Sequence, residues 1–502
     1  MLVPVIIISI ILLPIYLTTL LLLFVFKIII HTILKLKYKT RLILLESADT
    51  YWAVGNSFHN QSYILTILKD KPNDDIVKEI KNIIEEKLLK HTEDYAKVLC
   101  SLHTFLGYPY FLKEKFRSED FITIIDTQIT KYSCIKDIIY DFSSKGLPLD
   151  GKALWEIIVI QATTEWKYKS GLKEDQIAII LRENHTVTDG LSLMNLIANS
   201  FGDQVMDLSM YLKNIPRSPK SNIVAKLSKY LLLFMIVPGH LLIASLQKKL
   251  NRKLWKAPNI VHKQNVAYKC EDGRGLVEKI KIMKRDIGDV SFTEILIAAI
   301  SASLNRHFLK NTINIPDSVL LLIVATKDLK PMTVNDVPIL RNQFGMIIFE
   351  LPLIVNSNSM LKRLDILKKR ARPMLNSVLP LVDSFILFNL MGLFPTYIIK
   401  WLFPMAETVG ISNLPGFPKL NICNGYEVDD VFFFLPQRDT NGIGFSILTY
   451  DDRLHIGLTA DKASIPSKSH CESIIHDFFK NLDDLKIELD KNKLDNKVIE
   501  LE

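Results

Sequence analysis

The chain has 502 residues, of which 48% are hydrophobic and 23% are charged, and this balance excludes a mainly disordered protein. Its 19 glycines and 21 prolines exclude a collagen-like or low-complexity chain. The formal net charge of +8 fits a membrane surface or an anionic substrate as well as nucleic acid.

The cysteine pattern argues against both disulfides and a metal centre. The count of five is odd, and no Cys-x-x-Cys pair occurs. We therefore expect no metal site and reduced thiols in a protein that faces the cytosol. The five are Cys100, Cys134, Cys270, Cys423 and Cys471.

The first element in the chain is an uncharged stretch from Leu2 to Phe26. As a helix it is about 37 Å long, enough to cross a ~30 Å hydrocarbon core. The start is uncharged and no signal-peptide cleavage site follows, which favours a retained anchor. Five basic residues come next, before any acid: Lys27, Lys35, Lys37, Lys39 and Arg41. The positive-inside rule predicts a single-pass anchor with the N-terminus lumenal and the globular body cytosolic. The membrane that we expect is that of the endoplasmic reticulum.

Helical and strand patterns alternate after the anchor. Short apolar runs of branched residues predict buried strands, and 3.6-residue spacing predicts helices. The predicted helices cover residues 75–90, 191–198 and 294–304, and the predicted strands cover 157–160, 177–181, 319–325 and 346–351. Residues 444–450 and 453–458 flank Asp451-Asp452 and predict a hairpin. The mixture indicates an α/β or α+β protein with two domains and an N-terminal transmembrane helix.

Two more apolar stretches lie at residues 230–246 and 378–404. Pro238 and Gly239 interrupt the first, while Asp383 and Lys400 lie inside the second. Breakers and internal charges argue against clean membrane spans. We expect buried helices or helices that lie at the membrane interface.

These patterns divide the chain into five parts. The first half of the globular body carries the motif discussed next, and the second half follows an apolar, lysine-rich connector. The predicted parts are an anchor with its basic flank at 1–41, a first domain at 42–215, the connector at 216–262, a second domain at 263–482 and a charged surface tail at 483–502.

The most informative segment is Asn184-His185-Thr186-Val187-Thr188-Asp189-Gly190, between a predicted strand and a predicted helix. A neutral imidazole near its ordinary pKa of ~6.5 accepts a proton at neutral pH, so His185 is a candidate general base. Asp189 can hold the loop through backbone N–H groups or a basic partner, and Gly190 allows close approach. A solvated loop histidine, with Asp189 as an ordinary helix N-cap, is the alternative.

This segment resembles the His-His-x-x-x-Asp-Gly motif of the wax ester synthase/diacylglycerol acyltransferase family. The resemblance implies two domains with the chloramphenicol-acetyltransferase-like fold, with His185 as the catalytic base and Asp189 in a structural role. Asn184 replaces the family's first histidine and cannot titrate. Bacterial members lack the N-terminal anchor, so this segment is an addition here.

Further matches follow in the family's order over about residues 46–480. Each is short, but the ordered set is specific. They are Glu46-Ser47-Ala48-Asp49, Pro148-Leu149-Asp150 with Leu154-Trp155-Glu156, Asn342-Gln343-Phe344-Gly345, Ser412-Asn413-Leu414-Pro415-Gly416, and Gly442, Gly444, Ser446, Tyr450 and Asp461. The family's Asn-Asp pair at the start of a helix in the second domain reads Thr293-Glu294 here.

The resemblance implies an acyl-CoA-dependent O-acyltransferase that makes wax esters or triacylglycerol. The implied partners are acyl-CoA as co-substrate, a long-chain alcohol or diacylglycerol as acceptor, and membrane lipid, with no cofactor, metal or nucleic acid. The implied substrate-binding residues are Asn184, Gly190, Thr293, Ser412 and Asn413. A sterol or another small alcohol is an alternative acceptor, and a catalytically inactive lipid-binding or lipid-transfer protein is the alternative function. A hydrolase is disfavoured, since no Gly-x-Ser-x-Gly nucleophile elbow occurs.

Overall fold

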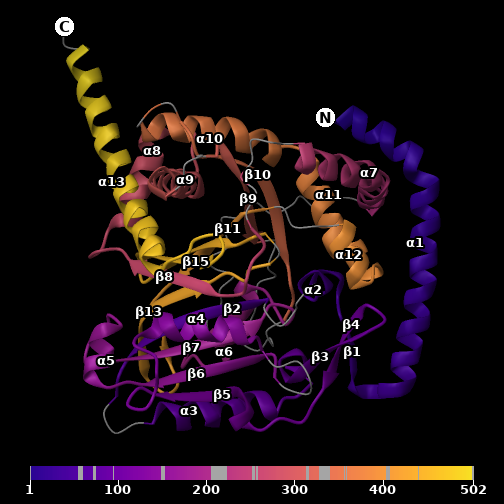
Figure 1. Cartoon of the computed structure of the whole chain (residues 1–502), viewed down its shortest axis with the longest axis horizontal. Coiled ribbons are helices and arrows are strands. Elements are labelled where there is room, and N and C mark those ends of the chain that lie inside the picture. The colour runs from indigo at the N-terminus through magenta and orange to yellow at the C-terminus, as the bar shows by residue number, and fades with distance from the viewer. Residues whose placement is uncertain are drawn as a thin grey trace.

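The computed structural model describes residues 2–54, 60–71, 75–93, 95–147, 153–204, 223–250, 255, 258–311, 316–326, 340–355, 357, 359–402, 407–438 and 440–499. Two six-stranded mixed sheets form the body, each covered by helices, and a layer of apolar helices lies along one edge (Figure 1). The predicted fold class, two sheet-containing α/β domains with a long apolar N-terminal helix, is confirmed. The Pro148-Leu149-Asp150 match lies outside the described residues.

The first sheet has the strand order β12-β13-β2-β7-β6-β5. Its strands are β12 (Asn421–Ile422), β13 (Tyr426–Phe434), β2 (Gln61–Lys69), β7 (Gln176–Asn184), β6 (Trp155–Gln161) and β5 (Ile122–Asp126). A small sheet beside it contains β1 (Leu42–Leu44), β4 (Tyr108–Lys113) and β3 (Cys100–Phe105). The helical elements of this half are α2 (Ser47–Trp52), α3 (Ile76–Ile83), η3 (Ile84–Leu89), η4 (Ala96–Leu99), η5 (Ser118–Phe121), α4 (Ile135–Lys145), α5 (Thr164–Lys169) and α6 (Gly190–Ser200).

The second sheet has the order β10-β9-β11-β14-β15-β8. Its strands are β10 (Phe344–Pro352), β9 (Ser318–Thr326), β11 (Val409–Phe417), β14 (Ile443–Tyr450), β15 (Arg453–Asp461) and β8 (Gln264–Cys270). Its helices are α8 (Leu276–Ile287), α9 (Phe292–Asn311), α10 (Met360–Leu375) and α13 (Lys468–Ile499). Apolar residues of both sheet and helices make a continuous core, which includes Phe445, Ile456 and Phe478.

One strand joins the two halves. β13 lies in the second half of the sequence, yet it pairs antiparallel with β2 in the first sheet, with Phe432 opposite Leu65. Separation of the two halves would break the backbone hydrogen bonds between β13 and β2 and leave buried N–H and C=O groups without partners. The two sheets therefore form one body on one side of any membrane.

The predicted secondary structure agrees with the observed elements except for their ends. The amphipathic helix at 75–90 begins at the N-cap Asp75 and continues from α3 into the π-helical turn η3. The predicted hairpin is β14 and β15, and the left-handed conformation of Asp451 and Asp452 suits its two-residue turn. Strand β7 continues to Asn184, three residues beyond the predicted end at Leu181.

The predicted surface tail at 483–502 needs a correction in its first part. Residues 468–499 form one helix, α13, in which Leu485 and Leu489 are buried in the core of the second domain, whereas residues 490–495 are exposed. Leu482, Leu485 and Leu489 form an apolar stripe at helical spacing and pack into the core of the second domain. This packing holds the helix on the domain although many of its other residues are charged.

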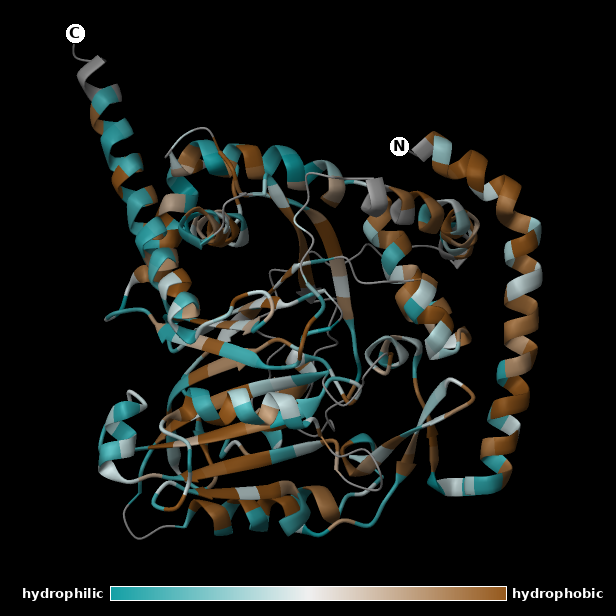
Figure 2. Ribbon diagram, in the orientation of Figure 1, coloured by the Kyte–Doolittle hydropathy of each residue, from teal (hydrophilic) through white to brown (hydrophobic). Residues whose placement is uncertain are grey.

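The apolar stretches form the helical layer at the edge of the body (Figure 2). Its elements are α1 (Leu2–Tyr38), η1 (Lys39–Arg41), α7 (Ile223–Leu250), α11 (Leu379–Phe385), η7 (Ile386–Leu390), η8 (Met391–Leu393) and α12 (Thr396–Leu402). Among the described residues, one helix is by itself long and apolar enough to cross a membrane, at Val3–Arg41. α7, which includes most of the described connector, packs on α1.

Candidate active site at the junction of the two domains

His185 lies in a short loop that leaves β7 and enters α6. Asn184 is the last residue of the strand, and its side-chain Oδ1 accepts hydrogen bonds from the Thr186 N–H (3.1 Å) and hydroxyl (2.7 Å). The main-chain N–H of His185 donates to the Asn60 carbonyl at 2.9 Å. Asn184 thus stabilises the loop, and it is absent from the described lining of the adjacent cavity.

Asp189 connects this loop to the second domain. One carboxylate oxygen accepts from the Ser192 N–H at 2.8 Å and caps α6, as the N-cap alternative predicts. The other accepts from the Gln343 N–H at 2.7 Å, immediately before β10. Among the described residues, two backbone N–H groups and no basic side chain bind this carboxylate, so Asp189 is a cap and also an interdomain contact.

The geometry around Asn342 fixes the proton on His185. The Asn342 Nδ2 donates to Asp49 Oδ1 at 2.9 Å and to the His185 carbonyl at 3.0 Å, so the amide oxygen is the atom that faces His185 Nδ1, at 3.1 Å. An amide oxygen only accepts, so Nδ1 carries the proton. The other ring nitrogen, Nε2, is then unprotonated, and the described residues make no hydrogen bond to it.

A buried ion pair supports Asn342 from behind. The Asp49 carboxylate is fully buried, and its second oxygen accepts from Lys97 Nζ at 2.6 Å. Burial raises the pKa of Asp49, while Lys97 and Asn342 act in the opposite direction. A buried charge stays ionised when it is paired and hydrogen-bonded, so the three groups form one polar unit.

Aromatic rings enclose the imidazole. Trp52 stacks on His185 with ring centroids 4.2 Å apart, and Phe344 approaches it edge-on at 6.4 Å. Burial lowers the pKa of His185, against the opposing influences of Asp189 and the Asn342 hydrogen bond. At neutral pH the ring is therefore neutral, which is the form that a general base requires.

A cavity between the two domains reaches His185, which is 8% exposed. Its empty space, including the part open to solvent, is about 780 Å³. Its walls are mostly apolar and come from both sheets, with Leu322, Val324, Leu414, Phe433, Phe434 and Leu435 among them. Gly190 and Ser412 also line the cavity. The Ser412 hydroxyl forms no hydrogen bond within the described chain, so it is available to a ligand.

Besides Asn184, two more predicted substrate-binding residues lie outside the described lining of the cavity. Asn413 follows Ser412 on β11, and its side chain donates to the Thr293 hydroxyl at 3.1 Å. Neither residue belongs to the described lining of the His185 cavity. Successive strand residues point to opposite faces, so the strand itself separates Ser412 from Asn413. Glu294 caps the start of α9 by accepting from the Ser291 N–H at 2.7 Å.

Sequence reasoning did not assign four residues of this site. Asp49 and Asn342 occur within matched family segments but were given no role, and Trp52 and Lys97 fall outside every motif. The ordered matches were the signal that could have drawn attention to the first two. The stacking of Trp52 depends on the position of α2, for which the sequence holds no local signal.

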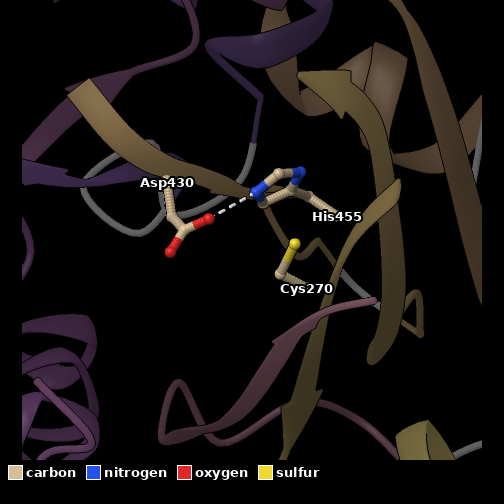
Figure 3. Close-up of side chains that lie close together, drawn as sticks. All are labelled: Cys270, Asp430 and His455. Carbon is tan, nitrogen blue, oxygen red and sulfur yellow. Dashed lines mark hydrogen bonds and ion pairs between the residues drawn. The ribbon is translucent and has the colours of Figure 1, made fainter. Parts of the chain in front are cut away.

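A second cluster, of Cys270, Asp430 and His455, has side chains of the kind that bind metals (Figure 3). The Arg453 guanidinium lies among them, with Nη2 3.0 Å from Asp430 and Nη1 3.5 Å from Cys270 Sγ. Burial raises the pKa of the Cys270 thiol to about 12, so it remains protonated. The positive charge of Arg453 and the protonated Cys270 thiol both disfavour binding of a metal ion here. The cluster fits a hydrogen-bond network that joins β8, β13 and β15.

Residues 340–486 match the family model described as the WS/DGAT C-terminal domain. This part of the chain is therefore similar to the C-terminal domain of the wax ester synthase/diacylglycerol acyltransferase family. The matched region includes Asn342 and the strands β10, β11 and β13, which contribute Phe344, Ser412 and Phe433 to the lining of the cavity. No curated protein sequence matches the chain.

Solved structures share the fold at low sequence identity. The wax ester synthase/diacylglycerol acyltransferase from Marinobacter aquaeolei VT8 is 14% identical with a TM-score of 0.59, over 89% of this chain and 99% of that one. TRI3 trichothecene 15-O-acetyltransferase from Fusarium sporotrichioides is 11% identical with a TM-score of 0.58, over 89% and 95%. The first condensation domain of the calcium-dependent antibiotic synthetase, with a substrate analogue, is 11% identical with a TM-score of 0.54, over 89% and 97%.

Proposed function

We propose that the whole chain is a wax ester synthase/diacylglycerol acyltransferase-like enzyme, a membrane-bound O-acyltransferase that uses His185 as its general base. It moves a fatty acyl group from acyl-CoA to the hydroxyl of a long-chain alcohol or a diacylglycerol, and makes wax ester or triacylglycerol. Its body lies on the cytosolic side of the endoplasmic reticulum, where acyl-CoA is available. No cofactor takes part besides the acyl-CoA co-substrate.

The observation that carries this proposal is the free Nε2 of a neutral imidazole at an interdomain cavity. The Nδ1–H of His185 donates a hydrogen bond to Asn342, and the face of the imidazole stacks on Trp52. These two contacts fix the orientation of the imidazole ring. A general base must reach the substrate proton within about 2.6–3.2 Å. An acceptor hydroxyl in the cavity can meet this requirement at Nε2.

The reaction balances with one base. Nε2 takes the hydroxyl proton as the acceptor oxygen forms a bond to the thioester carbonyl carbon. The tetrahedral intermediate then collapses, the carbon–sulfur bond breaks, and the departing CoA sulfur takes the proton from Nε2. Both substrates meet at one residue, so no covalent acyl-enzyme is needed.

Ser412 is the proposed donor to the tetrahedral oxyanion. Its hydroxyl comes from the second domain, faces the cavity that contains His185 and has no described partner. Loss of one oxyanion donor typically lowers kcat by about 10²–10³. We expect such a loss in Ser412→Ala, whereas Asn413→Ala, one residue along the strand and outside the cavity lining, should retain most activity.

The apolar surroundings support a lipid acceptor. Trp52, Leu322 and Phe344 line the cavity and also belong to the apolar cluster formed with α1, α7, α11 and η7. A continuous apolar cluster therefore extends from the helical layer to the cavity at His185. An alkyl chain bound in this cavity would be surrounded mainly by apolar side chains and exposed little to water.

The test is an assay of membranes that contain the wild type or His185→Ala, with labelled acyl-CoA and a panel of hexadecanol, diacylglycerol and a sterol. The proposal expects labelled ester from hexadecanol or diacylglycerol with the wild type and little with the variant. Ester formed only from the sterol would contradict the proposed assignment of a long-chain alcohol or a diacylglycerol as the acceptor. Equal product from both proteins would exclude His185 as the base, and binding of acyl-CoA without any ester would favour a lipid-binding protein.

A further inference from the structure

We infer that α1 lies in the plane of the membrane, bound along the body, and does not cross the bilayer. The partner surface is the lipid bilayer, and the contact is the outer apolar face of α1 together with the neighbouring apolar residues of α7. The N-terminus is then on the same side of the membrane as the body. This inference rests on the membrane attachment in the proposed function but not on acyl transfer.

The first observation is the length of the contact between α1 and the body. Val5, Leu20, Ile30 and Leu34 are buried, and Val5 and Leu34 lie about 44 Å apart along the helix. The N-terminal part packs on α7, and the C-terminal part packs on Tyr108, Tyr110 and Leu112 of β4. Figure 1 shows α1 running along one whole edge of the molecule.

The second observation is a close contact near the N-terminal end of α1. The Ser9 hydroxyl donates to the Ile236 carbonyl at 3.0 Å and accepts from the Gly239 N–H at 3.0 Å. A Cβ atom on Gly239 would lie 2.1 Å from the Val5 carbonyl oxygen, so the two helices touch through their backbones. Ser9 therefore lies at the middle of α7, on the surface of the body.

A crossing α1 is incompatible with this contact. If Lys27 marked the cytosolic boundary, Ser9 would lie about 27 Å deeper in the bilayer. The middle of α7 would have to reach the same depth, together with α11, which packs on α7. α11 also packs on β10, an edge strand of the second sheet, so α7 cannot lie that far from the body without losing this packing.

The exposed face of α1 has the chemistry of a lipid contact. Between Val3 and Phe26 the exposed large side chains are isoleucine, leucine, valine and phenylalanine, and none is charged. Lys35, Lys37 and Lys39 follow, at the end where they can meet anionic headgroups. On α7, Tyr230, Leu231 and Leu232 are also exposed. Apolar area of this extent in water would be strongly unfavourable.

Aromatic side chains near α1 fit the membrane interface. The turn between β3 and β4 exposes Leu106, and Gly107 in that turn accepts a hydrogen bond from Thr396 at the start of α12. On α12, Tyr397 and Trp401 are largely exposed. Exposed tryptophan and tyrosine are enriched at the level of lipid headgroups.

Topology mapping of the full chain tests the inference. The native Asn-x-Ser/Thr sequons cannot report on topology because Asn60 and Asn184 are buried. A short N-terminal extension with a new Asn-x-Thr sequon would be glycosylated if α1 crossed into the lumen. We expect an unmodified extension that added protease removes from sealed microsomes, in a protein that salt does not extract and detergent does. A glycosylated, protected extension would overturn the inference.

A matched pair of variants tests the contact itself. Gly239→Leu cannot keep the backbone contact with Val5, so we expect it to release α1 and give a glycosylated fraction of the extension. Thr18→Val is the control, because the Thr18 hydroxyl is exposed and bonds only to Pro14 within α1, at 2.9 Å. An unmodified extension in Gly239→Leu would show that α7 does not retain α1.

Two further outcomes are informative. A soluble dimer that does not bind vesicles of neutral and anionic phospholipid would mean that a second copy covers the apolar face, and the inference would fail. Acyl transfer is measured in the same microsomes. Its absence, with an unmodified N-terminal extension, would count against the proposed function and leave the membrane placement supported.

Discussion

His185 and His455 are two buried histidines in similar surroundings with different connections. Each packs against aromatic rings, Trp52 for His185 and Phe432 and Tyr450 for His455. His455 has Nε2 2.8 Å from Asp430 and Nδ1 3.1 Å from the Arg453 carbonyl, so both nitrogens face acceptors. His185 has one nitrogen bound to Asn342, and the other has no described partner.

The difference teaches that burial and a hydrogen-bonded partner do not make a histidine catalytic. A base needs one nitrogen held by the protein and one nitrogen available to a substrate. His185 has a cavity at its free side, whereas His455 is fully enclosed at 1% exposure. The first arrangement can transfer a proton, and the second can only connect strands.

The largest expected effect is that of His185→Gln. Glutamine keeps a hydrogen-bonding group but cannot take the proton from the hydroxyl of the acceptor alcohol. We therefore expect kcat to fall by a factor of about 10²–10⁴. Initial rates per folded enzyme, with saturating acceptor, measure this. The variant should elute and melt like the wild type, and activity within threefold of the wild type would show that another group is the base.

A smaller loss is expected for Asn342→Leu. Leucine removes the hydrogen bond that holds Nδ1–H and fixes the ring, a contribution of ~1–1.5 kcal/mol, so kcat should fall roughly tenfold. The KM for acyl-CoA should change little, because Asn342 lies behind the ring and outside the cavity lining. A rise in KM with an unchanged kcat would mean that Asn342 binds substrate instead.

The pH dependence should distinguish the buried base from an ordinary histidine. Burial lowers the pKa of His185, and the active form is the neutral ring, so activity should persist at pH ~6.5 and decline only at lower pH. The Asn342 hydrogen bond favours the protonated ring, so Asn342→Leu should move the decline lower still. An acid limb of kcat centred above pH ~6.5 in the wild type would contradict this assignment.

The smallest effect on kcat is expected for His455→Gln. This change disturbs hydrogen bonds to Asp430 and should lower the free energy of unfolding by ~1.5–3 kcal/mol, because one partner is charged. Thermal inactivation should accelerate while kcat per folded enzyme stays within twofold. A large loss of kcat at unchanged stability would remove the distinction between the two histidines.

The sequence alone predicted the parts of this site that depend on neighbouring residues. His185 and Asp189 lie in the short loop between β7 and α6, and Gly190 begins α6, so a strand, a loop and a helix in order were enough to identify them. Asn342 and Trp52 contact the ring from distant segments, and Lys97 supports Asn342 through Asp49, so only tertiary packing brings these residues together. The length and apolar composition of α1 were enough to predict contact with a membrane. The packing of α1 along α7 is a tertiary contact, so the sequence did not predict it.

The central claim is that His185 activates the acceptor for direct attack on acyl-CoA, and thiol release without acceptor tests it most directly. Wild-type enzyme is mixed with excess labelled acyl-CoA and no alcohol. We expect no burst of free CoA and no labelled acyl group attached to the protein. Addition of the acceptor should then start ester formation and CoA release together. A burst of one CoA per enzyme before the acceptor is added, with the acyl group bound to the protein, would contradict the account.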